Sequence, residues 1–444
     1  MNDIEKESSY LRRGSVLIIS IFIGGFIASY FFNVVISRIL GPHDYGDFKV
    51  AEAFTSLGCV LVLMGGSKAV ARFLPDQIRN QNGEGVWEYT RFYIKVILIS
   101  SSILITAVYF GHEYHLSIVD GDSYHPILLA SLAIPVAAMS ALLGGILQVA
   151  KRIDLAFIPW QVGNPLMRLA LCGFYFWVFG EMSSFQAIAI TLITSISVAL
   201  LSLFFIHRLS LMPIKRTGNS PQHKEWLRVS TPMMFIVVMQ MMMMQSDIYM
   251  IEYISGETAV GHFAAAQTTA KAVSSIQMAL FALVTPLIVT SLASGHLSVV
   301  ELNRRGFLMM VKVVLPIAIT ISYFGHPILK FYGHDTETAH LTMQTLIIGY
   351  SVSSILGFAA LWLQYSGNEK SVLTVLICTV AINILLNALL IPIFDIEGAA
   401  IATSTALTIS GITLSILMYK NLKIFPWTLI SKKEIDETGV LVGK

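Results

Sequence analysis

The chain of 444 residues has few charged side chains: only 13% are Asp, Glu, Lys or Arg, whereas 55% are hydrophobic. A soluble protein of this length would carry roughly 25% charged residues, so too little polar surface is available to cover a water-facing globule. The charged residues are also clustered between long apolar runs. The scarcity of charge therefore excludes a soluble protein and indicates an integral membrane protein.

Cysteine is also scarce. The three cysteines, Cys59, Cys172 and Cys378, all fall within apolar segments, which argues against disulfides or a metal cluster. The sequence shows no phosphate-binding glycine loop with lysine and serine, no nucleotide-binding fold and no soluble domain, so it predicts neither an ATPase nor a cofactor. We therefore expect the energy for transport to come from an ion gradient, the membrane potential or removal of the product.

Apolar runs long enough to cross about 30 Å of hydrocarbon as a helix recur along the whole chain. We expect an all-α polytopic membrane protein of about twelve transmembrane helices, six on each side of the polar segment 208–230. The predicted helices lie at 15–37, 48–66, 92–110, 126–148, 156–179, 185–207, 231–251, 260–290, 304–324, 340–363, 371–393 and 397–420.

The lysines and arginines gather at one end of these helices. If the N-terminus is cytoplasmic, 22 of the 29 fall in cytoplasmic segments, and only Arg38, Lys49 and Lys330 fall in outer ones. The positive-inside rule then places both termini in the cytoplasm. The first apolar run exceeds 20 residues without a small-residue cleavage site after it, so it predicts a spanning helix rather than a removed signal peptide.

Two predicted outer turns resemble each other. The stretch ILGPHDYGDFKVAEAF has a counterpart in YISGETAVGHFAAAQT, where Gly41, Gly46, Phe48 and Ala51 recur as Gly256, Gly261, Phe263 and Ala266, each 215 residues later. Two copies of six helices insert with the same orientation, as parallel repeats about an axis along the membrane normal. We predict an N-terminal lobe at 1–207, a cytoplasmic linker at 208–230, a C-terminal lobe at 231–425 and a cytoplasmic tail at 426–444.

Three stretches carry a family resemblance: RILGPHDYGDFKVAEAF, SDIYMIEYISGETAVGHFAAAQTTAK and LQYSGNEKSVLTVLICTVAINILLNALLIPIFDIEGAAIATSTAL. With them the chain resembles the multidrug/oligosaccharidyl-lipid/polysaccharide exporter superfamily, most closely its polysaccharide transporter branch of O-antigen-type flippases. The resemblance implies a V-shaped pair of lobes in the bacterial cytoplasmic (inner) membrane. It also implies a flippase that moves an undecaprenyl-pyrophosphate-linked oligosaccharide from the cytoplasmic to the outer leaflet by alternating access, in polysaccharide or lipopolysaccharide synthesis.

Two cations lie deep within predicted spans. An ionisable residue there costs about 2.5–3.5 kcal/mol on insertion scales, so it usually faces a cavity or a partner. By the rise of 1.5 Å per residue, Arg168 lies about 20 Å into its helix and Lys271 about 17 Å into its own. We interpret both, with Lys312 nearer a helix end, as substrate-binding residues that receive a pyrophosphate. The alternative for Arg168 and Lys271 is an ion pair or hydrogen bond between helices.

The resemblance bears on two of the candidates. Many members of the superfamily carry a cation near the position of Gln267, which is four residues from Lys271 and so shares its helix face. Arg38, at the outer end of the first predicted helix, is either an interfacial anchor or part of the cavity mouth. Its arginine-x-x-glycine element is similar to one in the lipid II flippases, where an acidic residue follows at the place of Asp47.

Four carboxylates are candidates for ion coupling, because each lies close to the predicted cationic cavity. They would take up or release a proton or sodium ion as the lobes rock; alternatively, they only neutralise the nearby cations. These candidates are Asp47, Glu52, Asp247 and Glu252.

Two rival functions are considered. A multidrug exporter of cationic compounds predicts an acidic cavity, whereas the embedded Arg168 and Lys271 predict a cationic one. A membrane polysaccharide polymerase or glycosyltransferase needs a catalytic acid or base on a substantial outer loop, but no predicted outer loop exceeds about sixteen residues. We therefore expect a transporter rather than an enzyme. Its expected partners are the lipid-linked glycan, membrane lipid and H⁺ or Na⁺, with docking to a polymerase or glycosyltransferase left open and no nucleic acid.

Overall fold

A computed structural model describes residues 3–80, 82–113, 126–211, 223–333 and 337–427. The first half of the chain forms α1 (Asp3–Leu63), α2 (Gly66–Phe73), α3 (Pro75–Arg79), α4 (Gly83–Glu113), α5 (Pro126–Val149), α6 (Ile153–Phe157), the π-helical η1 (Ile158–Gly163), α7 (Asn164–Phe179) and α8 (Ser184–Arg208). The second half forms α9 (His223–Ser255), α10 (Glu257–Ala293), α11 (His296–Tyr323), α12 (Gly325–Lys330), α13 (Glu337–Leu356), α14 (Phe358–Tyr365) and α15 (Glu369–Leu422).

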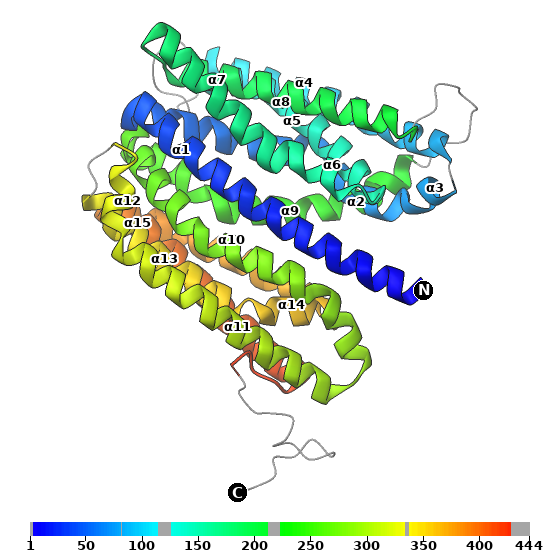
Figure 1. Cartoon of the computed structure of the whole chain (residues 1–444). Helices are drawn as coiled ribbons and strands as arrows, with labels where there is room; N and C mark the ends of the chain where they lie inside the picture. The colour runs from blue at the N-terminus through cyan, green and yellow to red at the C-terminus, as the bar shows by residue number, and fades with distance from the viewer. Residues whose placement is uncertain (1–2, 81, 114–125, 212–222, 334–336, 428–444) are drawn as a thin grey trace, which may run out of the picture. The chain divides into compact units, whose positions relative to one another are not determined.

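These ranges contain helices and no strand, which confirms the all-α class (Figure 1). The predicted linker at 208–230 and the predicted tail at 426–444 extend into 212–222 and 428–444, which lie outside the described residues.

Nine helices in the described part of the chain are long and apolar enough to cross a membrane. Two of them, within α1 and α15, run past a residue with non-helical backbone angles: Gly41 (φ 78°, ψ 173°) and Asp395 (φ 52°, ψ −134°). Both breaks fall where two predicted spans meet. Because α10, with 37 residues, also covers a predicted span, the structure is compatible with twelve transmembrane helices.

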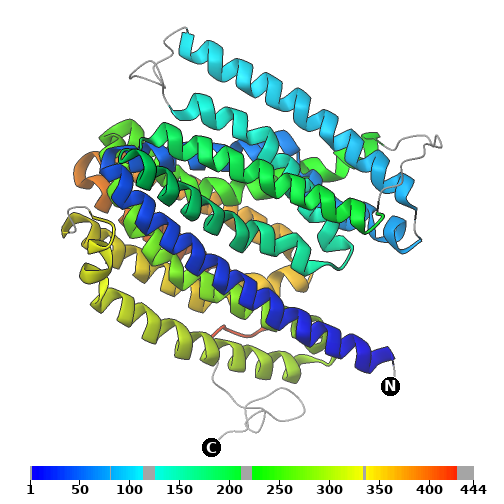
Figure 2. The same cartoon turned by 45° about the horizontal axis from the view of Figure 1, so that its top comes forward.

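The chain packs as two compact units. Within residues 24–261, here called unit 2, α5 and α8 run side by side (Figures 1 and 2). Within residues 1–23 and 262–444, here called unit 1, α13 and α15 do the same. These boundaries follow from packing. The lobes at 1–207 and 231–425 follow from the repeated sequence, and they stay a prediction.

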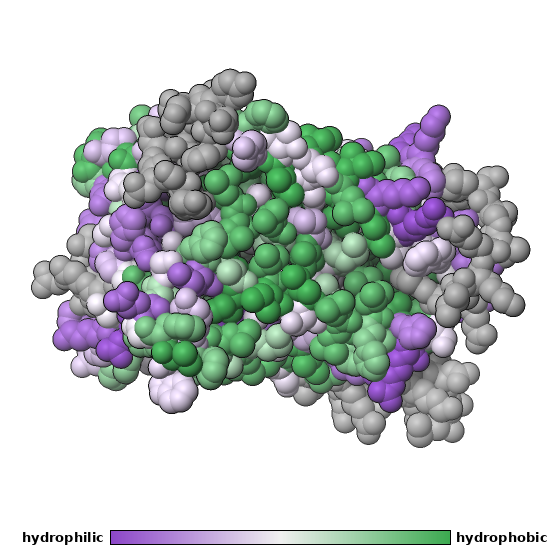
Figure 3. Space-filling view, turned by 90° about the horizontal axis from the view of Figure 1, so that it is seen from above, coloured by the Kyte–Doolittle hydropathy of each residue, from purple (hydrophilic) through white to green (hydrophobic). Residues whose placement is uncertain are grey.

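The molecular surface is apolar over a wide band. Figure 3 shows apolar side chains gathered between two more polar ends. In unit 2, for example, Ile103 on α4, Trp177 on α7 and Leu200 on α8 are 66%, 81% and 61% exposed. Large apolar side chains at this exposure suit contact with lipid rather than with water, as expected for a multi-pass membrane protein.

The two matching turns have the same backbone. Gly41 and Gly256 both have positive φ, 78° and 86°, which a side chain would disfavour. A Cβ on Gly46 would overlap the Glu257 carbonyl oxygen, and a Cβ on Gly261 would overlap the Pro42 carbonyl oxygen. Since Glu257 and Gly261 lie 215 residues after Pro42 and Gly46, each turn contacts the other through the same pair of positions. This reciprocal contact is the geometry that a duplicated turn predicts.

The first turn of α9 is anchored in unit 2 by aromatic side chains. Trp226 is 7% exposed, and its ring lies 5.1 Å from that of Tyr89 and 5.5 Å from that of Phe92. The hydroxyl of Tyr93 donates to the Trp226 carbonyl oxygen at 3.4 Å. Ring pairs at these separations add to the stabilisation from burial.

Trp226→Ala is expected to lower the free energy of unfolding by about 3–5 kcal/mol, because it leaves a cavity among three aromatic rings. Thermal unfolding of the purified protein in detergent measures the effect. Trp177→Ala is the matched control, since Trp177 is 81% exposed and should shift the transition little. Equal shifts for the two variants would contradict the anchoring role of Trp226.

Candidate functional site

The start of the fifth predicted span packs closely against the first. A Cβ on Gly25 of α1 would lie 2.6 Å from the Gln161 carbonyl oxygen of η1, so only glycine allows this approach. The π-helical stretch contains Pro159, and α7 has a second proline, Pro165, in its first turn. Proline removes a backbone donor, and single π-helical turns often occur at functional sites. This local geometry brings Arg168 of α7 against α1.

Five side chains of unit 2 form one polar cluster, the Arg168 cluster: Asn33, Tyr45, Lys49, Glu52 and Arg168. Arg168 Nη1 donates to Glu52 Oε1 at 2.9 Å, and Lys49 Nζ donates to Glu52 Oε2 at 2.7 Å. Lys49 Nζ and the Tyr45 hydroxyl both donate to Asn33 Oδ1, at 3.1 and 3.0 Å. Both halves of α1 and the start of α7 therefore meet at one carboxylate and one amide.

The Arg168 cluster holds more positive than negative charge. Its formal charges are two cations and one carboxylate, and the side chains of Lys49 and Arg168 are each only 12% exposed. The guanidinium also lies over the Phe32 ring, 5.9 Å from Cζ to the centroid. Arg168 Nε is buried and has no acceptor within the described residues. A buried cation with an unused donor suits an anionic ligand.

The cluster joins two residues to which the sequence assigned separate roles. Arg168 was expected to bind substrate and Glu52 to couple an ion, yet they form one ion pair between helices. The structural alternative for Arg168 is thus present in the molecule, although the unused Nε leaves capacity for a ligand. Lys49, Asn33 and Tyr45 were not predicted to take part. The spacing of three residues between Lys49 and Glu52 is the one sequence signal that pointed to them.

The predicted residues near the outer turn lie outside this cluster. Arg38 is exposed and has no ion pair among the described residues. Asp47 is 8% exposed and accepts from Ser184 Oγ at 3.4 Å. The ligand atoms of Asp47, His43 and Asp44 lie within 4.8 Å of one another, close enough for one cation to share. Because oxygen ligands suit hard cations, this group is the place where Asp47 would meet a coupling ion.

Unit 1 contains two of the predicted cations. Lys271 on α10 is half-buried and donates from Nζ to Gln267 Oε1 at 2.7 Å, so the two positions compared across the superfamily are in direct contact. Lys312 on α11 is exposed. On α9, in unit 2, Asp247 is 1% exposed and Glu252 is half-buried. None of these four belongs to the Arg168 cluster, and their roles stay predictions.

Comparison with known proteins identifies the family. The family of polysaccharide biosynthesis proteins matches residues 11–292. The chain belongs to this family. The MatE family matches residues 232–389 in addition. No curated protein matches the chain significantly in sequence.

Solved structures show the same fold for this member of the polysaccharide biosynthesis family. A multidrug resistance MATE family transporter of the MOP superfamily, in an inward-facing conformation, superposes with a TM-score of 0.72 at 11% identity, over 90% of this chain and 94% of that one. The lipid II flippase MurJ, in an inward closed conformation, gives 0.69 at 16% identity over 92% and 88%. The matched families and these neighbours are transporters and flippases, not enzymes.

Proposed function

We propose that this protein is a flippase for an undecaprenyl-pyrophosphate-linked oligosaccharide. The observation that carries the proposal is the Arg168 cluster, which is apolar in its surroundings, positive in net charge and equipped with an unused guanidinium donor. A pyrophosphate offers several acceptor oxygens, and arginine binds such groups with directed, charge-assisted hydrogen bonds. Membership in the polysaccharide biosynthesis family supports a saccharide as the rest of the substrate.

The mechanism follows from the way in which Glu52 joins two cations. While Glu52 is ionised, it holds Lys49 and Arg168 and competes with the substrate for their donors. Protonation of Glu52, or its displacement by phosphate oxygens, frees both cations at once. Glu52 would thereby couple an H⁺ gradient or the membrane potential to alternating access. Lys271 and Lys312 would contribute further positive charge, Arg38 would line the outer mouth, and Asp47, Asp247 and Glu252 would be additional ion-coupling sites.

The direction and membrane are part of the same proposal. The distribution of lysine and arginine favours a cytoplasmic location for both termini, and the lipid carrier favours the bacterial inner membrane. The substrate would then enter from the cytoplasmic leaflet and leave in the outer one. A glycosyltransferase would supply it and a polymerase would consume it.

A multidrug exporter of cations is the second candidate, because several structural neighbours transport drugs or bind dyes. The Arg168 cluster argues against it, since one carboxylate faces two cations. An organic cation would meet net repulsion there.

Proteoliposomes separate these possibilities. Purified protein is reconstituted with a labelled prenyl-pyrophosphate oligosaccharide, and the label that becomes accessible at the opposite leaflet is measured. We expect translocation without covalent change, and no uptake of a cationic dye under the same gradient. Dye transport without glycolipid translocation would support the exporter instead, and new glycosidic bonds would refute both transport functions.

A further inference from the structure

A second cationic site lies in unit 2, away from the Arg168 cluster. The first turns of α4 and the start of α9 enclose a cavity of about 190 Å³, here called the Arg91 pocket. Its lining is Glu88, Arg91, Phe92, Lys95 and His223. None of these residues belongs to the Arg168 cluster. The volume equals that of about six water molecules in the liquid, enough for a phosphate group with its first waters.

One wall of the Arg91 pocket is rigid. The rings of Phe92 and His223 stack at 4.5 Å with an angle of 16° between their planes. Trp226 packs against both rings, at 5.5 Å from Phe92 and 5.4 Å from His223. Since Trp226 is itself buried, this wall holds the imidazole in place beside the two cations.

The charges of the Arg91 pocket are unbalanced. Arg91 and Lys95 are four residues apart on α4, so they share a helix face, where like charges repel. Neither has an ion-pair partner among the described residues, and Glu88 is the pocket's single carboxylate. The formal charge is therefore positive even with a neutral His223. An anion bound between Arg91 and Lys95 would relieve their repulsion.

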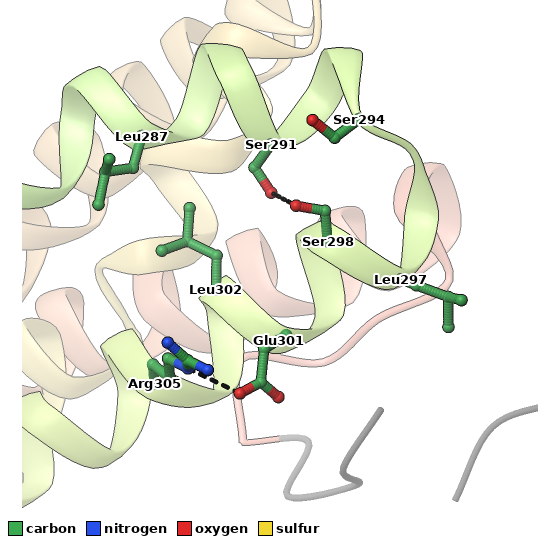
Figure 4. A pocket seen from close by; sticks show the side chains of 8 residues that line it. All are labelled: Leu287, Ser291, Ser294, Leu297, Ser298, Glu301, Leu302 and Arg305. Carbon is green, nitrogen blue, oxygen red and sulfur yellow. Dashed lines mark hydrogen bonds and ion pairs between the residues drawn. The ribbon is translucent and has the colours of Figure 1, made fainter. Parts of the chain in front are cut away.

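Other exposed arginines of this chain have carboxylate partners. Arg79 pairs with Asp76 at 3.0 Å, and Arg152 pairs with Asp154 at 2.8 Å. The groove in Figure 4, between the end of α10 and the start of α11, shows the same arrangement: Arg305 donates to Glu301 at 2.6 Å. That groove is larger but its arginine is already paired, so it offers an anion less than the Arg91 pocket does.

We propose that the Arg91 pocket binds a phosphate-type anion. Arg91 would supply the directed donors, Lys95 a mobile point charge, and His223 a ring donor held by Phe92. The phosphate belongs either to the head group of an anionic phospholipid or to a soluble phosphate compound. The positive-inside distribution predicts that this end of α4 faces the cytoplasm, where both are present.

The test compares wild type with Arg91→Gln/Lys95→Gln in two arms. In the first, equilibrium dialysis measures the binding of radiolabelled inorganic pyrophosphate to protein in neutral detergent. In the second, native mass spectrometry measures retention of phosphatidylglycerol against phosphatidylcholine. We expect at least one arm to show saturable binding that is about tenfold weaker, or more, in the double variant, because each lost charged hydrogen bond costs about that factor.

Controls separate this site from other cations. Arg305→Gln removes an exposed arginine from the groove of Figure 4 and should leave binding unchanged. Arg168→Gln should remove any diphosphate bound at the Arg168 cluster but keep the component that depends on Arg91 and Lys95, so this proposal and the proposed transport function fail separately. Arg91→Lys should retain most of the binding.

The two arms identify the source of the phosphate. Pyrophosphate binding without phosphatidylglycerol retention indicates a soluble compound, and the reverse indicates a lipid head group. The proposal is overturned if neither probe binds wild type, or if both bind equally to wild type and to the double variant. Arg91 and Lys95 are exposed, so the double variant should fold; the single variants give the same comparison if it does not.

Discussion

Glu52→Ala is expected to abolish glycolipid translocation in proteoliposomes while the protein is still produced and inserted. Glu52 Oε1 and Oε2 hold Arg168 and Lys49, and both cations lie on the proposed substrate path. Without the carboxylate, no group remains that can hold and release them together, so the coupled step is lost. Translocation at wild-type rate by the variant would remove Glu52 from the mechanism.

Stability must be measured beside transport, because removal of one partner of a buried ion pair destabilises by about 3–5 kcal/mol. Glu52 is 30% exposed, so we expect the lower end of that range or less. Asp154→Asn is the matched control: it takes the carboxylate from an arginine whose side chain is 42% exposed. Exposed pairs contribute about 0–1 kcal/mol, so this variant should keep both stability and transport.

The double variant Glu52→Gln/Arg168→Gln distinguishes a functional pair from a structural one. It keeps the side-chain volumes and leaves no buried charge unpaired between these two positions. We expect thermal stability to recover toward wild type, whereas translocation stays lost. Recovery of both properties would show that the ion pair serves packing alone.

Gly46→Val is expected to prevent stable folding. Its Cβ would overlap the Glu257 carbonyl oxygen, which is backbone and has little room to move away from the crossing. Forcing atoms into a packed contact usually costs about 1–3 kcal/mol, and a clash with backbone should exceed this range. The amount of monodisperse protein in detergent and its unfolding temperature measure the effect.

Gly173→Ala provides the comparison for Gly46→Val. A Cβ on Gly173 meets no heavy atom of the described residues within 4 Å, and the position lies inside α7. Alanine is favoured over glycine in a helix by about 1 kcal/mol, so this variant should be neutral or more stable. If Gly46→Val were as stable as Gly173→Ala, the close crossing of the two turns would be refuted.

Hydrophobic runs were sufficient to predict the helices, since length and apolarity decide which segments can span a bilayer. The breaks at Gly41 and Asp395 fall in the predicted gaps between spans. The π-helical turn at Ile158–Gly163 was not predicted, because its hydrogen-bond pattern depends on the packing of Gly25 against Gln161 rather than on local sequence.

The candidate site was predicted in parts. Arg168 and Glu52 stood out singly because charge is costly in a span. Their pairing was not predicted, since 116 residues separate them and no periodic pattern reports which helices are neighbours. Lys49 was assigned to an outer turn from its place between two apolar runs. The structure buries most of its side chain, because Asn33 and Glu52 satisfy the ammonium group.

The contact between the turns at Gly46 and Gly261 is isologous in form. Position 46 meets position 257 and position 261 meets position 42, which is the rule for the interface of a twofold homodimer. A half-length chain with this turn would thus possess a surface complementary to itself. Fusion of two such genes would preserve the interface from the start, and the single chain would then be free to acquire Arg38, Lys49 and Glu52 in one copy only.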